Sequence, residues 1–330
     1  NIIITSLLLE GIIPALGTLL SLAPTLLILF FCISLLEDSG YLSRVAALMD
    51  RLLRPLGLSG RSFVCLILGY GCTVSGVLAS KILTDKEEKK LVLKLVPYSI
   101  CPARMMILLA VLPLLFHEYA FFALLLIYLL ANSIMILMSF IFRMKKKNKV
   151  PYFILELPKY RFPSFKNAFY LVEEKLKDYI ARAFNIILIA TVFIWFLSSF
   201  DYKMNFLLED RNTSLLSILG NSISFIWLPF NFPEPYKVTS SLIIGLISKE
   251  SFLSTMVILY GSLENIINLF TSESLIALIV FVMLYMPCIA VFSVVKKENK
   301  SFIKTFLIFT LETLIAYLVS ILIYFILMLI

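Results

Sequence analysis

Apolar segments long enough to cross a lipid bilayer recur along this 330-residue chain. A membrane-spanning helix needs roughly 18 or more mostly apolar residues and keeps its backbone hydrogen bonds within itself. The composition agrees, because 61% of the residues are hydrophobic and 15% are charged, against about 45–50% and about 25% in soluble domains. The sequence therefore predicts an all-α, polytopic integral membrane protein with about eight transmembrane helices. We expect these spans at about residues 16–36, 91–116, 120–142, 179–199, 214–230, 238–260, 274–295 and 303–329.

Loop charge predicts the orientation of the chain. Loops 37–61 and 81–90 are rich in Arg and Lys, and loop 143–178 opens with a run of both. Short loops with this bias stay in the cytoplasm. We therefore expect these three loops to be cytoplasmic, 200–213 and 261–273 to lie outside, and the N-terminus to face outward. The net charge of +8 is then a topology signal, and we expect no nucleic-acid partner.

Segment 62–80 does not fit this scheme as a simple span. It lies between two cationic loops, so a full crossing would put one of them outside. It also contains Gly69, Gly71 and Gly76 around Cys72. Irregular backbone at membrane depth is tolerated only where it is buried in protein or lines a cavity. We expect a re-entrant or broken segment here, with Gly69 and Gly71 on the transport path.

The two halves of the chain carry similar features in the same order. A glycine-containing segment and a polar loop precede Pro97–Ala103 in the first half, and the same order precedes Pro287–Ala290 in the second. Paired, interrupted apolar segments in corresponding halves point to a transporter binding site. We expect a first half at 1–142, a cytoplasmic loop at 143–178 and a second half at 179–330.

Three cysteines beside helix-breaking residues are predicted metal ligands. Cys72 follows a Gly-Tyr-Gly sequence, Cys101 precedes a proline and Cys288 follows one. Thiolates are soft ligands that suit Fe(II), Zn(II) or Cu(I). We expect Cys72 and Cys101 to form a transient two-sulfur site, with the sulfurs within about 4 Å of each other because metal–sulfur bonds are about 2.3 Å long. Cys32 and Cys65 are expected to be small buried hydrophobes.

Ionisable residues inside apolar spans are costly and are functional hypotheses by default. Lys249 and Glu250 lie near the middle of a predicted span. Adjacent side chains on a helix do not face one another, so the two are expected to find different partners or to sit at a helix break. Arg104 follows the break at Cys101 and is suited to neutralising a carboxylate or to holding the broken helix. For Glu312, in the last span, we expect a structural polar contact.

Two further carboxylates, Glu37 and Asp38, end the first predicted span. A helix boundary at the membrane surface fits them. So does an ion-attracting or gating position at the mouth of a pore, and both interpretations stay open.

Enzyme motifs are missing from the sequence. It contains no Gly-x-x-x-x-Gly-Lys-Ser/Thr phosphate loop, no His-Glu-x-x-His and no Gly-x-Ser-x-Gly. This chain is therefore not expected to be an enzyme, and it cannot by itself bind GTP or ATP in the phosphate-loop manner.

An ordered series of motifs carries a family resemblance. They are Leu35–Arg44, Met49–Arg51, Gly57–Val64, Gly69–Cys72, Cys101–Arg104, Glu156–Arg161, Ile194–Ser198, Ser248–Glu250 and Leu284–Cys288. From about residue 8 to its end, the chain resembles the membrane domain of the ferrous iron transport protein B (FeoB) family. The resemblance implies two Gate-type pseudo-repeats forming an inner-membrane Fe(II) permease. In that family a cytosolic G domain and a first transmembrane helix precede this region, which fits the expected outward N-terminus.

The chain departs from the family pattern beside both cysteines. Thr73, Ser75 and Gly76 stand where the family usually has Asn, Pro and Ala, and Ile100 and Pro102 stand where it has Ser and Gly. Both cysteines and the following arginine keep their places.

These observations and the resemblance together predict Fe(II) uptake through a Gate-type pore in a bacterial plasma (inner) membrane. Fe(II) is the transported substrate, and no cofactor is bound permanently. The expected partners are Fe(II), the lipid bilayer, a separate G domain or small accessory Feo proteins, and further copies in a homo-oligomer. Two alternatives remain. One is a nucleoside or organic-solute Gate transporter, which needs a wide polar cavity, and the other is a non-transporting membrane scaffold.

Overall fold

A computed structural model describes residues 5–144, 160–201, 206 and 214–329. Their secondary structure is helical, apart from two isolated β-bridges that join Phe200 to Phe206 and Asp201 to Ser214. The all-α membrane fold is therefore confirmed. Within the described residues, three helical stretches are long and apolar enough to cross a membrane, or up to six if each pair of helices bent at a short break is one span.

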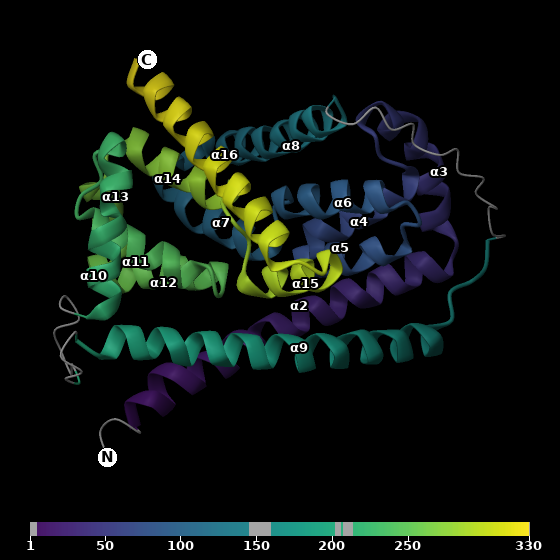
Figure 1. Cartoon of the computed structure of the whole chain (residues 1–330), viewed down its shortest axis with the longest axis horizontal. Helices are drawn as coiled ribbons and strands as arrows, with labels where there is room; N and C mark the ends of the chain where they lie inside the picture. Colours follow the sequence, from purple (N-terminus) through teal and green to yellow (C-terminus); the bar gives the residue numbers. More distant parts are fainter. Residues whose placement is uncertain (1–4, 145–159, 202–205, 207–213, 330) are drawn as a thin grey trace.

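Two long helices lie side by side along one face of the molecule (Figure 1). The π-helical turn η1 (Leu7–Ile12) leads into α2 (Ile13–Asp38), and α9 (Phe165–Ser199) packs against α2. These two helices contain the predicted spans 16–36 and 179–199. α9 begins well inside the segment that we expected to be a cytoplasmic loop, of which residues 145–159 lie outside the described residues.

The remaining helices form two sets with the same order of parts: a helical hairpin, a broken helix and a long closing helix. The first set comprises α3 (Tyr41–Leu53), η2 (Arg54–Leu56), α4 (Gly60–Gly71), α5 (Thr73–Ala79), η3 (Ser80–Ile82), α6 (Lys86–Leu95), η4 (Val96–Tyr98), α7 (Pro102–Phe116), η5 (His117–Tyr119) and α8 (Ala120–Met144). The second comprises α10 (Leu215–Ile223), η7 (Ser224–Phe230), α11 (Pro235–Gly245), α12 (Lys249–Tyr260), α13 (Leu263–Leu269), α14 (Ser272–Leu284), α15 (Ile289–Asn299) and α16 (Phe302–Leu329). The predicted pseudo-repeats are thus visible as matching architecture.

The predicted re-entrant segment 62–80 is a hairpin. α4 and α5 are separated only by Cys72, whose extended backbone (φ −160°, ψ 121°) interrupts the helix. The two arms touch where a Cβ atom added to Gly76 would lie 2.7 Å from the Cα atom of Gly69. Only glycine permits this approach, so the glycines that suggested a break also bring the arms together.

A buried carboxylate fixes the base of this hairpin. Glu88 of α6 is 7% exposed, and its Oε1 atom accepts hydrogen bonds from the Ser59 backbone N–H at 2.6 Å and from the Ser62 hydroxyl at 2.5 Å. A negative charge at a helix N-terminus is favourable, because the first backbone N–H groups have no helical partner. Glu88 therefore holds the start of α4 against α6.

The predicted span 214–230 is wrong as a straight helix. α10 ends at Ile223, and the 3-10 helix η7 follows it up to Asn231, which has a positive φ of 51°. The stretch 215–230 is bent by 111° from α11. The Trp227 ring anchors η7 in the core, with its centroid 4.9 Å from that of Phe281 in α14.

α14 is the central helix of the second set. Ten of its 13 residues are buried, against five of the 28 residues of α16. A helix that is hydrophobic all round is buried by neighbours, whereas an apolar face without neighbours in a membrane protein meets lipid. α16 therefore lies at the periphery, where its exposed apolar side chains would face acyl chains.

Contacts between loops support the predicted cytoplasmic side. Glu298, near the end of α15, pairs with Lys89 of α6 at 2.7 Å and with Lys81 of η3 at 3.7 Å. Asp38 accepts a hydrogen bond from the backbone N–H of Ser164 at 2.7 Å. Segments expected to share one side of the membrane are thus in contact.

Candidate functional site

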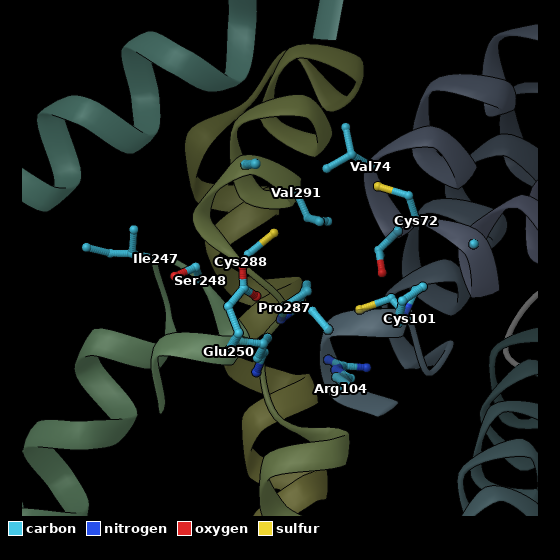
Figure 2. A pocket seen from close by; sticks show the side chains of 16 residues that line it. Cys72, Val74, Cys101, Arg104, Ile247, Ser248, Glu250, Pro287, Cys288 and Val291 are labelled. Atoms are coloured by element: carbon cyan, nitrogen blue, oxygen red, sulfur yellow. The ribbon is translucent and has the colours of Figure 1, made fainter. Parts of the chain in front are cut away.

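Four interruptions of the helices surround one cavity of about 90 Å³, here called the cysteine cavity (Figure 2). Two hairpin tips and two breaks in helices supply its walls. The lining residues are Gly71–Val74, Cys101–Arg104, Ile247–Glu250, Pro287, Cys288, Ala290 and Val291. Segments from both sets of helices therefore form one site.

Cys72 reaches this cavity from the tip of the α4/α5 hairpin. Its backbone N–H donates to the Leu68 carbonyl at 2.8 Å, and its carbonyl accepts from Gly76 N–H at 3.0 Å. The residue thus closes α4 and opens α5. Gly71 also lines the cavity, and a Cβ atom there would lie 2.6 Å from a methyl group of Leu29 in α2.

Cys101 lies in the break between α6 and α7. The chain leaves η4 in extended conformation at Ser99 and re-enters a helix at Pro102, which occupies the first helical position. Proline suits that position because its missing N–H has no helical partner there. Cys101 is the residue immediately before α7 and is half-buried at the cavity wall.

Arg104 ties this break to the second set of helices. Its side chain is fully buried at 0% exposure. Its Nη1 atom donates to the carbonyls of Pro97 at 2.9 Å and Ser99 at 3.1 Å, and its Nη2 atom donates to the carbonyl of Tyr285 at 2.8 Å. Of the two roles expected for Arg104, holding the broken helix is therefore the one that the hydrogen bonds support.

The second set builds the opposite wall with its own hairpin and break. The α11/α12 hairpin turns at Ser248, and α14 gives way to α15 through an extended stretch that ends at Cys288. A hydrogen bond of 2.7 Å from Ile289 N–H to the Leu246 carbonyl joins the two. Ser248, which we did not single out, occupies the position in this hairpin that Cys72 occupies in the first.

Lys249 is buried at the start of α12. It is 2% exposed, its Nζ atom lies 3.0 Å from the centroid of the Tyr285 ring, and no hydrogen-bond acceptor is recorded for it in the described part of the chain. A buried ammonium over an aromatic face gains a cation–π interaction but loses its hydration. The expected position at a helix break is confirmed for Lys249. Its neighbour Glu250 also lines the cavity, with one carboxylate oxygen that lacks a recorded hydrogen bond there.

The charges around the cavity favour an anion. α7, α12 and α15 all start at its wall, and each helix N-terminus carries about half a positive charge. Arg104 and Lys249 add two basic side chains, and among the described lining residues the carboxylate comes from Glu250. A cysteine stands directly before α5, α7 and α15, so three sulfurs lie at the starts of helices. A set of thiolates there would be a soft-cation site.

The structure brings the three cysteines to one cavity but does not form a closed metal site. Figure 2 shows Cys72, Cys101 and Cys288 facing the same space from three different elements. Among the described residues, no group of three or more His, Cys, Asp or Glu side chains is close enough to hold a metal ion. The expected approach of the Cys72 and Cys101 sulfurs stays a prediction.

Some predicted site residues lie elsewhere. Glu37 and Asp38 are exposed at the end of α2 and are not part of the cavity wall. Gly69 is buried in the hairpin, where a Cβ atom would lie 2.7 Å from the Ser99 hydroxyl, so it packs α4 rather than lining the cavity. Cys65 is fully buried as expected, whereas Cys32 is exposed on α2. The expectation for Cys32 was wrong because an apolar thiol incurs no penalty on a surface that faces lipid.

Glu312 of α16 is a residue whose role the sequence did not suggest. It is 1% exposed, and neither of its carboxylate oxygens has a hydrogen-bond partner in the described residues. α16 packs against α14 and α15, so this carboxyl group lies behind the cavity wall and not in its lining. Among the described residues, the structural polar contact that we expected has no hydrogen bond. The one available signal was a lone carboxylate in an otherwise apolar span.

Comparisons with known proteins agree with this architecture. The Gate family model, described as "Nucleoside recognition", matches residues 19–145 and 180–302. The chain belongs to the Gate family. A second model, "Ferrous iron transport protein B C terminus", matches residues 124–175 of this Gate protein.

Curated relatives carry one name. The Gate protein is 33% identical to "Fe(2+) transporter FeoB" of Staphylococcus aureus (strain COL), over 96% of this chain and 48% of the relative. The protein of the same name from Campylobacter jejuni is 34% identical, over 97% and 55%, and that from Methanocaldococcus jannaschii is 30% identical, over 98% and 50%. The Gate protein thus spans about half the length of the curated relatives that it matches, and no solved structure matches it significantly.

Proposed function

We propose that this Gate protein is the membrane permease part of a ferrous iron transporter in a bacterial inner membrane. The observation that carries the proposal is the convergence of three cysteines, each directly before a helix, on one small cavity. The names of the relatives give Fe(II) as the cargo. Soft sulfur ligands suit a first-row divalent ion of this kind.

The size of the cavity favours an ion over an organic solute. The cavity measures about 90 Å³. A water molecule needs roughly 10–15 Å³ of such space, so the cavity suits an ion with a few water molecules. Pockets for small organic ligands are typically about 300–1,000 Å³. The lining includes no Asn, Gln or aromatic side chain to recognise a base. A nucleoside carrier is therefore the weaker candidate.

The buried charges argue against a scaffold without transport function. Arg104, Lys249 and Glu312 are each at most 2% exposed. Removing a charge from water costs several kcal/mol unless it is well paired, and Lys249 and Glu312 have no recorded hydrogen bonds within the described residues. A purely structural role would be served as well by apolar side chains. Ionisable groups inside a membrane domain are accordingly functional hypotheses.

In the proposed mechanism the sulfurs of Cys72 and Cys101 bind the ion transiently, and Cys288 takes part from the second half. Backbone carbonyls at the breaks or water complete the coordination. Positive charge from Arg104 and Lys249 weakens binding, so that the ion is released rather than trapped. Residues 1–142 and 179–330 act as two halves joined by 143–178, and no cofactor is bound permanently.

Thiol-to-hydroxyl substitutions test the proposal. We expect Cys72→Ser, Cys101→Ser and Cys288→Ser each to lower Fe(II) uptake into proteoliposomes by at least about tenfold. Mutating a residue that only supports a metal ligand already lowers metal affinity or activity by about this factor. Cys32→Ser is the matched control, because Cys32 lies on α2 outside the cavity. Full uptake by the triple cavity variant would refute sulfur ligation.

A second experiment addresses the energy source and the partners. The chain has no phosphate-loop sequence, so we propose that any GTP hydrolysis comes from a G domain, with accessory Feo proteins and homo-oligomerisation as further elements. Fe(II) uptake is measured with and without a separately expressed G domain and GTP. Stimulation by GTP only when the G domain is present supports this arrangement. Equal uptake under all conditions would show that the permease part works alone.

A further inference from the structure

A second cavity, here called the lysine cleft, lies between α6, the end of α8 and the start of α16. Its volume is about 370 Å³, several times that of the cysteine cavity. Lys90, Lys94 and Lys304 line it, and no Asp or Glu does so among the described residues. A volume in this range holds a small organic ligand, and the lining predicts that the ligand is anionic.

The three lysines of the cleft differ in their contacts. The Lys90 Nζ atom pairs with Glu87 at 2.6 Å, and the Lys94 Nζ atom lies 4.4 Å from the centroid of the Phe142 ring. For Lys304, no ion pair is recorded in the described chain. By contrast, Lys81 and Lys89 nearby share the carboxylate of Glu298. The described lining of the cleft therefore presents three lysines, of which Lys90 pairs with Glu87.

The wall beside these lysines is apolar and continuous with the surface that would face lipid. Phe142, Leu307, Ile308 and Leu311 line the cleft. Leu307 is 60% exposed and Leu311 is 42% exposed on α16. Lys304 lies in the first turn of α16, directly after the segment that contains Lys296, Lys297 and Lys300, and Leu307 and Leu311 follow about one and two turns further along the helix. This order matches a phospholipid, with an anionic headgroup above an acyl chain.

We propose that the lysine cleft binds one anionic phospholipid of the cytoplasmic leaflet. Its phosphate lies between Lys94 and Lys304, and one acyl chain runs along Leu307 and Leu311. Basic pockets between transmembrane helices on the cytoplasmic side are suited to such headgroups. A free phosphate ion would use the lysines but not the apolar wall, so the wall favours the lipid. The proposal does not depend on which ion passes through the cysteine cavity.

Native mass spectrometry of the purified chain in neutral detergent tests the site, because it counts bound lipids directly. The probes are phosphatidylglycerol, phosphatidylcholine and inorganic phosphate. The test variant is Lys94→Gln with Lys304→Gln. The matched control is Lys86→Gln with Lys297→Gln, which removes the same charge from exposed lysines outside the cleft.

We expect one phosphatidylglycerol per chain, bound more tightly than phosphatidylcholine. The test variant should bind it about twentyfold to thirtyfold more weakly, which is about 1 kcal/mol for each lysine, and the control should match the parent chain. Three results would overturn the proposal: equal binding by both double variants, equal affinity for the two lipids, or displacement of phosphatidylglycerol by millimolar inorganic phosphate. Unchanged thermal unfolding of the test variant shows that weaker binding is not caused by misfolding.

Discussion

A methyl group added to Gly76 is the sharpest probe of the hairpin that carries Cys72. In Gly76→Ala the new Cβ atom would lie 2.7 Å from the Cys65 carbonyl oxygen and from the N and Cα atoms of Gly69. All three are backbone atoms and cannot rotate away. Ordinary contact begins at 3.4 Å, so α5 must move away from α4 by about 0.7 Å. Because Cys72 joins the two helices, it moves with them.

Two energy terms of opposite sign act in this variant. Overpacking of this kind costs about 1–3 kcal/mol, while replacing a helical glycine by alanine returns about 1 kcal/mol. The net loss of stability is therefore about 0–2 kcal/mol, which is too small for a decisive unfolding assay. Positioning is more sensitive, because a misplacement of about 1 Å at a reacting centre costs about a hundredfold in rate.

Fe(II) uptake into proteoliposomes is accordingly the informative assay. We expect Gly76→Ala to lower the uptake rate by roughly tenfold or more, with a near-normal unfolding midpoint. The control is Gly17→Ala in α2, where a Cβ atom would meet no atom within 4 Å; it should transport normally and be slightly more stable. Normal uptake by Gly76→Ala would refute the reasoning, since it would mean that the hairpin does not position a residue on the transport path.

The buried charges give three further predictions. Arg104→Lys replaces a guanidinium group that donates three hydrogen bonds with a single ammonium group, so both the unfolding temperature and Fe(II) uptake should fall. Unchanged values of both would contradict the role of Arg104 in linking the two helix breaks. Glu312→Gln replaces a buried carboxyl group, whose oxygens have no hydrogen-bond partner among the described residues, with a side chain of the same size that cannot ionise, so thermal unfolding should shift upward; a marked downward shift would mean that the surrounding helices hold the carboxyl group specifically. Lys249→Met removes a buried amino group that has no hydrogen-bond acceptor within the described residues, so thermal unfolding should shift to a higher temperature. A marked shift to a lower temperature would mean that the favourable contact of Lys249 with the Tyr285 ring is larger than the cost of its lost hydration.

The positions of the chain breaks could be predicted because they depend on local residues. Glycines around Cys72 and prolines beside Cys101 and Cys288 interrupt helices wherever those helices lie. The hairpin at 62–80 followed from the same residues together with loop charge. These features were enough to predict the membrane fold and most of the cavity wall.

Features that depend on packing between distant segments could not be predicted. The contact of Lys249 with Tyr285 and the position of Glu312 behind the wall arise only when α12, α14 and α16 assemble. For Glu37 and Asp38, a helix boundary and a pore mouth give the same sequence pattern, and the structure adds that both residues are exposed and lie outside the lining of the cysteine cavity.

The hydrogen bonds between the breaks have a mechanical consequence. Arg104 links the α6/α7 break to the α14/α15 break, and Ile289 N–H links the latter to the α11/α12 tip. These three walls are thus joined to one another by hydrogen bonds, and together they are here called the frame. In the described residues, one side-chain hydrogen bond, from the Tyr70 hydroxyl to Asn132 Oδ1 of α8, joins the α4/α5 tip to another helix, and the other hydrogen bonds of the tip stay within its own hairpin. If the cavity opens alternately to the two sides of the membrane, this tip is the wall that can swing at the smallest cost in hydrogen bonds. An ion held by Cys72 would then be carried on the moving part, and one held by Cys101 or Cys288 would stay with the frame.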